Sequence, residues 1–77
     1  DAKVMLAVLA AAQAKALEKS TWVGKAFPER ARAMHLGEAE HRPIHGQATP
    51  EQAKSLADEG VPIAPLPLPV VPPDEAN

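Results

Sequence analysis

The residues best suited to chemistry are three histidines that lie close together in the chain, His35, His41 and His45, with Glu38 and Glu40 among them. Imidazole and carboxylate groups bind Zn²⁺, and two histidines four residues apart can share one face of a helix. A proline lies between the last two histidines, however, and argues against a helix there. The cluster offers a small metal- or ligand-binding site centred on His35, Glu38 and His41. We nevertheless predict no tightly bound zinc and no cofactor, because these ligands lie on no regular element.

Nothing near these histidines supplies the rest of an enzyme active site. Acid–base chemistry by His35 and Glu38 would need a nucleophile or a phosphate-binding loop beside it, and the serines and threonines stand in no catalytic motif. A histidine in the last turn of a helix is explained by its favourable interaction with the helix dipole. The sequence therefore assigns no catalytic residue and favours a protein that is not an enzyme.

Two helices are expected to precede the cluster. Residues 2–19 contain no Gly or Pro and are rich in strong helix formers. A second helix is predicted by one apolar stripe: Val23, Phe27, Ala31 and Met34. Pro28 leaves two alternatives, a kinked helix over residues 21–36 or a helix that begins near Pro28 itself. The unbroken stripe favours the kinked helix, which Gly37 would end.

The second half of the chain is predicted to hold one more helix. Thr49 is a good N-cap, a proline follows it, and Gln52 completes a capping box, so a helix over residues 49–59 is expected. Residues 38–48 show neither a helical nor a strand period and are interpreted as a connection anchored by Ile44. The fold class predicted from these elements is all-α: a two-helix hairpin, a third short helix and a proline-rich extension.

That extension covers residues 61–77 and follows a small helical domain at residues 1–60. Six of the nine prolines lie between Pro62 and Pro73, which excludes a central strand. We interpret it as a strap whose Leu and Val side chains lie across the helices, and expect its last four residues to fray. The alternative is a polyproline ligand for a partner, but so many aliphatic residues favour the strap.

The first helix has more apolar surface than a chain of 77 residues can cover. Met5 and Leu9 fall on one face and Val4 and Val8 on another side beside it, so the helix is apolar nearly all round and should be buried on two sides. A core with one Trp and one Phe, and no disulfide, supplies little stability. We therefore expect a homo-oligomer, or docking to an N-terminal domain of a longer parent protein. Trp22 is predicted to be mostly buried against the first helix.

The charge pattern excludes some partners. Eight basic and ten acidic residues give a net charge of −2 without any block of like charge, which argues against nucleic-acid binding. No apolar run approaches the ~20 residues that a membrane-spanning helix needs. The absence of cysteine is compatible with the cytoplasm, which is the location we expect.

The middle and end of the chain resemble a family of small bacterial proteins catalogued only as a domain of unknown function. The resemblance spans residues 20–68 and rests on these positions: Val23, Gly24, Phe27, Ala31, Arg32, His35, Gly37, Glu38, Ala39, Ile44, Gly46, Ala48, Thr49, Glu51, Ala53, Leu56, Glu59, Gly60, Val61, Leu66 and Pro67. It implies a two-part protein whose N-terminal part, a zinc-ribbon-like segment with paired cysteines, is absent from this sequence. Pro28 departs from the pattern, and the family implies no catalytic residues.

These observations predict a non-catalytic interaction or assembly module. The candidate interaction residues are Val4, Val8, Trp22, His35 and Glu38. The alternative is the metal- or ligand-binding domain described above.

Overall fold

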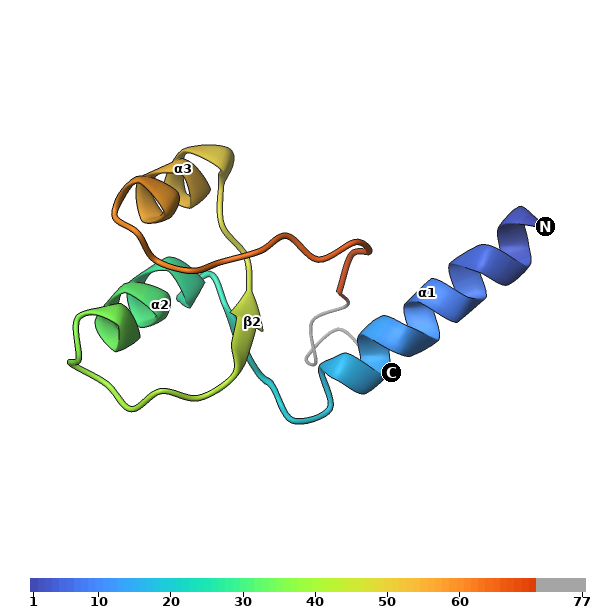
Figure 1. Ribbon diagram of the computed structural model, residues 1–77, viewed down its shortest axis with the longest axis horizontal. Helices are drawn as coiled ribbons and strands as arrows, with labels where there is room; N and C mark the ends of the chain where they lie inside the picture. Colours follow the sequence, from blue (N-terminus) through green and yellow to red (C-terminus); the bar gives the residue numbers. More distant parts are fainter. Residues whose placement is uncertain (71–77) are drawn as a thin grey trace.

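The structure, a computed structural model, describes residues 1–70 of the chain. Figure 1 shows the order of its elements. They are α1 (Ala2–Ala16), β1 (Thr21–Gly24), α2 (Phe27–His35), β2 (Ile44–Gly46) and α3 (Pro50–Asp58). The predicted all-α fold is therefore wrong, because the described residues contain a two-stranded sheet beside three helices.

The sheet joins two segments that the sequence pattern did not separate from their surroundings. β1 and β2 run parallel, with Trp22 opposite His45. The N–H of Thr21 donates to the carbonyl of Pro43 at 3.0 Å, and the N–H of Gln47 donates to the carbonyl of Gly24 at 2.9 Å. The segment Thr21–Gly24 contains β-branched and aromatic residues, which favour a strand. Strands of three and four residues are too short to show an alternating pattern.

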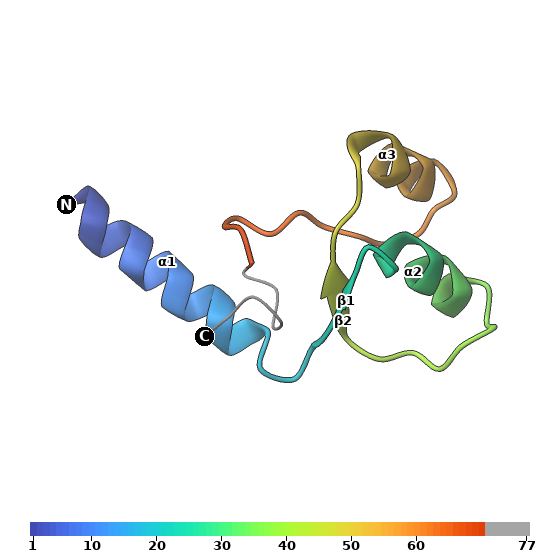
Figure 2. The ribbon, with the colours of Figure 1, turned by 180° about the vertical axis from the view of Figure 1, so that it is seen from behind.

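The predicted helical hairpin is also wrong. The chain leaves β1 through Gly24, whose φ of 55° is in the left-handed region. α2 then begins at Phe27, so Pro28 lies in the first turn, where its missing N–H costs no helical hydrogen bond. Of the two predicted alternatives, the helix that begins near Pro28 is therefore confirmed, and the kinked helix over residues 21–36 is wrong. α1 does not pack along α2; it extends away from the sheet, α2 and α3, which we call the body (Figures 1 and 2).

A small core holds α2 and α3 together. Leu56 of α3 is fully buried and contacts Ala31 of α2 and Val61, the first residue of the strap. The predicted start of α3 is confirmed: the hydroxyl of Thr49 accepts from the N–H of Gln52, and the Gln52 amide accepts in return from the N–H of Thr49. Three half-buried side chains pack around this core: Phe27, Ile44 and Ile63.

An ion pair ties the same two helices at the surface. Arg32 of α2 donates from Nε and Nη2 to the two carboxylate oxygens of Glu59, at 2.7 and 2.8 Å. The guanidinium hydrogen bonds lower the pKa of Glu59 and raise the pKa of Arg32. A two-pronged pair fixes the relative position of α2 and α3 better than a single contact would.

This pair predicts how stability depends on acid. Because the pKa of Glu59 is lower in the folded chain than in the unfolded chain, its contribution is present above the ordinary pKa of about 4.5 and is lost as pH falls through the lower, folded value. Urea denaturation between pH 3 and 7 should show a smaller loss of stability at acidic pH for Glu59→Gln than for the wild type. Glu51→Gln, outside the pair, is the control. Equal acid dependence in all three proteins would contradict the prediction.

The fold also requires a close backbone contact between β2 and β1 at Gly46. A side chain at Gly46 would place its Cβ against the carbonyl oxygen of Gly24 and 2.8 Å from the Cβ of Phe27. Both neighbours are fixed by β1 and by the first turn of α2, so neither can move aside cheaply. Only glycine lets β2 approach β1 and α2 this closely.

We therefore predict that Gly46→Ala destabilises the fold by about 1–3 kcal/mol, the usual cost of overpacking. The control is Gly37→Ala: Gly37 has a φ of 76° and open space around it, so that variant isolates backbone strain, on the order of 1–2 kcal/mol. Urea denaturation gives both free energies. Loss of the Trp22–His45 ring contact, seen as changed Trp fluorescence, should accompany Gly46→Ala alone. A Gly46→Ala protein as stable as the wild type would overturn the argument.

Candidate functional site: an exposed apolar helix and an apolar groove

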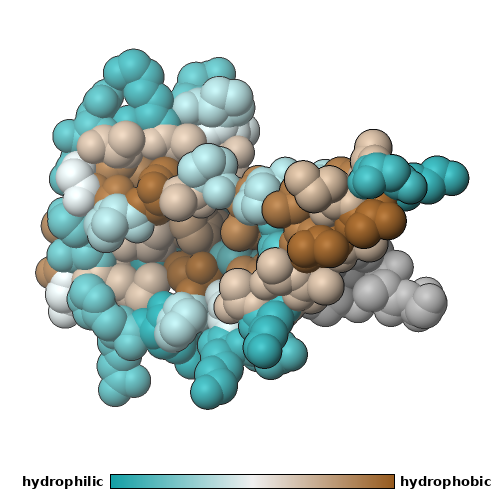
Figure 3. Space-filling view, turned by 45° about the vertical axis from the view of Figure 1, so that its right-hand side comes forward, coloured by the Kyte–Doolittle hydropathy of each residue, from teal (hydrophilic) through white to brown (hydrophobic). Residues whose placement is uncertain are grey.

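α1 presents large apolar side chains to solvent. Its residues contain no buried side chain, and five large apolar ones are exposed, by 59, 65, 55, 59 and 45%: Val4, Met5, Leu6, Val8 and Leu9. Figure 3 shows them as a hydrophobic area along α1. Val4 and Val8, the predicted interaction residues, thus remain uncovered by residues 1–70.

α1 is held to the rest of the chain mainly at its C-terminal end. The side-chain amide of Gln13 donates to the carbonyl of Leu68 at 2.9 Å and accepts from the N–H of Leu68 at 3.0 Å. The amide thus substitutes for a neighbouring strand and satisfies both backbone groups of a strap residue. At the other end, Oδ1 of Asp1 caps the helix by accepting from the N–H groups of Lys3 and Val4.

The Gln13 contact predicts how the strap can be released. Gln13→Met keeps the length of the side chain but removes both hydrogen bonds, and Gln13→Glu keeps only the acceptor. The amide of Leu68 should then exchange with solvent much faster in Gln13→Met and at an intermediate rate in Gln13→Glu, as followed by NMR. The Val61 amide, bonded to the carbonyl of Leu56, is the internal control and should not change. Unchanged protection of Leu68 in Gln13→Met would refute the role of this contact.

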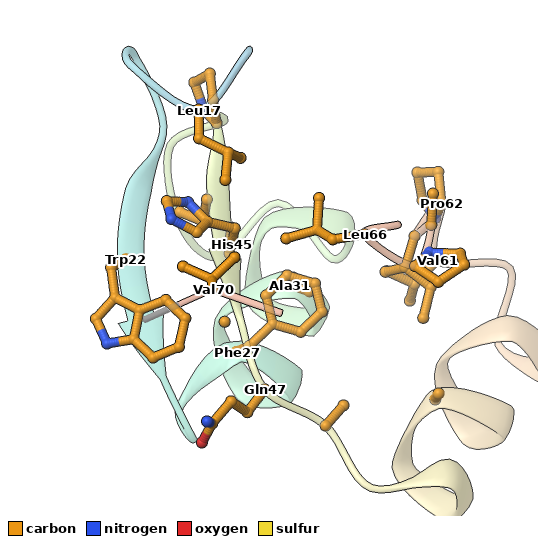
Figure 4. A pocket seen from close by; sticks show the side chains of 18 of the residues that line it. Leu17, Trp22, Phe27, Ala31, His45, Gln47, Val61, Pro62, Leu66 and Val70 are labelled. Carbon is orange, nitrogen blue, oxygen red and sulfur yellow. The ribbon is translucent and has the colours of Figure 1, made fainter. Parts of the chain in front are cut away.

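Between the strap and the body lies an apolar groove of about 1340 Å³. Figure 4 shows Trp22 and His45 on one side of it and Val61 and Pro62 of the strap on the other, with Phe27 at its base. Its lining is mostly aliphatic and aromatic. Val61 and Ile63 of the strap pack against the core between α2 and α3, and the strap also forms one wall of the groove.

The polar group that faces this groove from β2 is His45. Its Nδ1 lies 2.7 Å from the hydroxyl of Ser20, and its ring meets the Trp22 ring edge-on, with centroids 5.6 Å apart. Trp22 thus lies on a strand rather than on a helix, and most of its side chain is buried. Its predicted contact with the first helix stays a prediction. A serine and a histidine at this distance could form a nucleophile and base only with an orienting acid and an oxyanion hole. Among residues 1–70, no carboxylate hydrogen bonds to His45, so the pair connects the end of α1 to β2.

The predicted histidine cluster is dispersed. His35 ends α2, whereas Glu38 and His41 lie in the connection to β2, and all three are exposed. Over the described part of the chain, no three His, Asp or Glu residues lie close enough to hold one metal ion. His35, His41 and His45 all contribute to the lining of the groove, without forming such a group.

The structure adds residues that sequence reasoning missed. Gln13 and Ser20 form their contacts with Leu68 and His45, which lie 55 and 25 residues away along the chain. No local pattern marks either contact, because each depends on a backbone path that only the folded chain defines. A polar Gln within an otherwise apolar helical face was the one available signal for the first.

The fold and these surfaces define a small α+β module with an exposed apolar helix. A family model described as "Protein of unknown function (DUF1178)" matches residues 1–71, and the chain belongs to this family. The match includes α1, which the resemblance seen in the sequence did not reach. Neither the curated proteins nor the solved structures contain a significant match. The bacterial origin and the zinc-ribbon-like segment implied by the resemblance stay predictions.

Within residues 1–70, no helix is both long enough and apolar enough to cross a membrane.

Proposed function

We propose that the chain is a non-catalytic assembly module that associates with a protein surface through the apolar face of α1. The observation that carries the proposal is the exposure of Met5, Leu6, Val8 and Leu9 on consecutive turns of one helix. A 15-residue helix that contacts its own chain mainly through Gln13 is near the limit of stability in water. A surface that covers its apolar side would supply the missing stability.

The size of the apolar surface sets the strength of the association. Full burial of a Leu, Met or Val side chain contributes about 1.5–3 kcal/mol, and these side chains are already about half covered. Roughly 1 kcal/mol per side chain therefore remains to be gained on association. Association itself costs ~4–15 kcal/mol in lost freedom of motion. The balance favours a weak, reversible complex over a permanent one.

The metal-binding alternative has less support, because its three residues are exposed and dispersed. The lining of the groove is mostly apolar, and its histidines belong to no group of metal-binding side chains among the described residues. The α1 surface is therefore the feature on which a function rests best.

The proposal is tested by a charge placed on the apolar face. Leu9→Glu should abolish concentration-dependent protection of the α1 amides against hydrogen exchange, because a buried carboxylate without a partner is costly. Ala7→Glu carries the same charge two residues away on the opposite side of the helix and should leave the protection unchanged. Amides of α3 report that the body stays folded. α1 amides that exchange freely at every concentration in the wild type would refute the proposed function.

A further inference from the structure

The exposed face of α1 has the spacing of a helix that pairs with another helix. Residues three and four apart lie along its centre: Ala2, Met5, Leu9, Ala12 and Ala16. Leu6 flanks this line on one side and Val8 on the other. The large side chains occupy the N-terminal half, and the C-terminal half is mostly alanine. This inference rests on the proposed function. We propose that the partner is a second copy of this chain and that the two α1 helices pair antiparallel through this face. The two-fold axis lies between the helices, at the level of Ala7 along the helix axis.

This arrangement buries the large side chains together at the centre. Residues whose numbers add up to 14 lie at the same level, so Leu9 of each copy meets Met5 of the other. The two Val8 side chains approach each other on one flank and the two Leu6 side chains on the other. Toward the ends, Ala2 meets Ala12, where small side chains let the helices come close. Each copy uses the same surface, so the contact forms a dimer and cannot extend into a filament. Two-fold dimers of this kind are the commonest homo-oligomers.

Charge complementarity selects the antiparallel direction. Asp1, Val8 and Lys15 are spaced by seven residues and lie along the same flank of α1. Antiparallel pairing through Val8 places Asp1 of each copy beside Lys15 of the other, which a parallel pair cannot do. Both capping hydrogen bonds of Asp1 use Oδ1, so Oδ2 is available to the ammonium group.

The rest of the fold sets the length of the overlap. The strap is bound at Gln13, and the body begins beyond Leu17. In this register Gln13 lies at the same height along the helix axis as residue 1 of the second copy. The paired segment therefore ends at the point where the strap contacts α1. In Figure 1 the body lies at the C-terminal end of α1. The two bodies of an antiparallel pair therefore lie at opposite ends of the paired helices, whereas a parallel pair would bring them to the same end.

Cysteine cross-linking tests this geometry, since the chain has no cysteine of its own. Full-length Ala2→Cys and isotope-labelled Ala12→Cys proteins are mixed and oxidised with oxidised glutathione, and the disulfides are identified by mass. The antiparallel pair predicts mixed disulfides in excess over either homodimer by about tenfold, because two Ala12 positions would lie ~15 Å apart along the axis, beyond the ~7 Å that a disulfide spans. In denaturant the same mixture should give the statistical ratio.

A second measurement tests the charge pairing. Lys15→Glu should weaken dimerisation roughly 2- to 30-fold in sedimentation, the effect of two exposed ion pairs. Adding Asp1→Asn should recover part of the loss, because asparagine caps a helix as well as aspartate does but carries no charge to repel the carboxylate introduced at position 15. Equal dimerisation by the wild type and Lys15→Glu would contradict the charge pairing.

The outcomes separate this inference from the proposed function. Ala12→Cys homodimers in excess would show a parallel pair and overturn the antiparallel geometry. A monomer in sedimentation whose α1 amides are still protected would overturn the second copy as the partner, and would point to cover by its own chain or another domain. Unprotected α1 amides in a monomer would overturn both.

Discussion

The close approach of β2 to β1 at Gly46 is the contact on which the rest of the structure depends. It brings the backbone of Gly46 against Gly24 and Phe27, which no larger residue would allow. The contact places His45 beside Trp22 and directs the chain toward α3. Parallel strands of this length are not stable alone, so the sheet relies on α2 and α3 packing beside it. Sheet and helices therefore form one cooperative body around Leu56.

That body has few large apolar side chains, and most of those it has pack within it rather than against α1. Its buried centre consists of Ala31, Leu56 and Val61. The two aromatic side chains, Trp22 and Phe27, lie on the sheet and at the base of the groove. Leu36 and Leu66 are exposed as well, and neither covers the apolar side chains in the N-terminal half of α1.

Local signals in the sequence predicted the parts of the fold that depend on local interactions. The capping box at Thr49 and the absence of Gly and Pro before Ser20 located α3 and α1. The sheet was missed because its strands pair across 23 residues, from Trp22 to His45, and their register depends on a close approach at Gly46 that no periodicity reveals. Pro28 was the informative residue for α2: its position in a first helical turn outweighed the apolar stripe, which continues across β1 only by coincidence of spacing.

In the candidate site, too, the features that depend on local sequence could be predicted and those that join distant segments could not. The excess of apolar surface at Val4 and Val8 could be recognised from composition and helical geometry, since both are local properties. The groove, the Ser20–His45 contact and the binding of the strap by Gln13 could not, because each joins segments far apart in the chain.

Gln13 also links the two surfaces of the molecule. It belongs to the same helix as the apolar face, and its amide must hold a fixed orientation to bind both backbone groups of Leu68. A helix of this length frays readily when it is not covered. A partner that orders α1 therefore lowers the entropic cost of holding the strap, and a strap bound at Leu68 in turn favours the helical state of α1. By linkage, the partner's effect on strap binding equals the effect of strap binding on the partner's affinity. Covering α1 and holding the strap at Leu68 therefore strengthen each other.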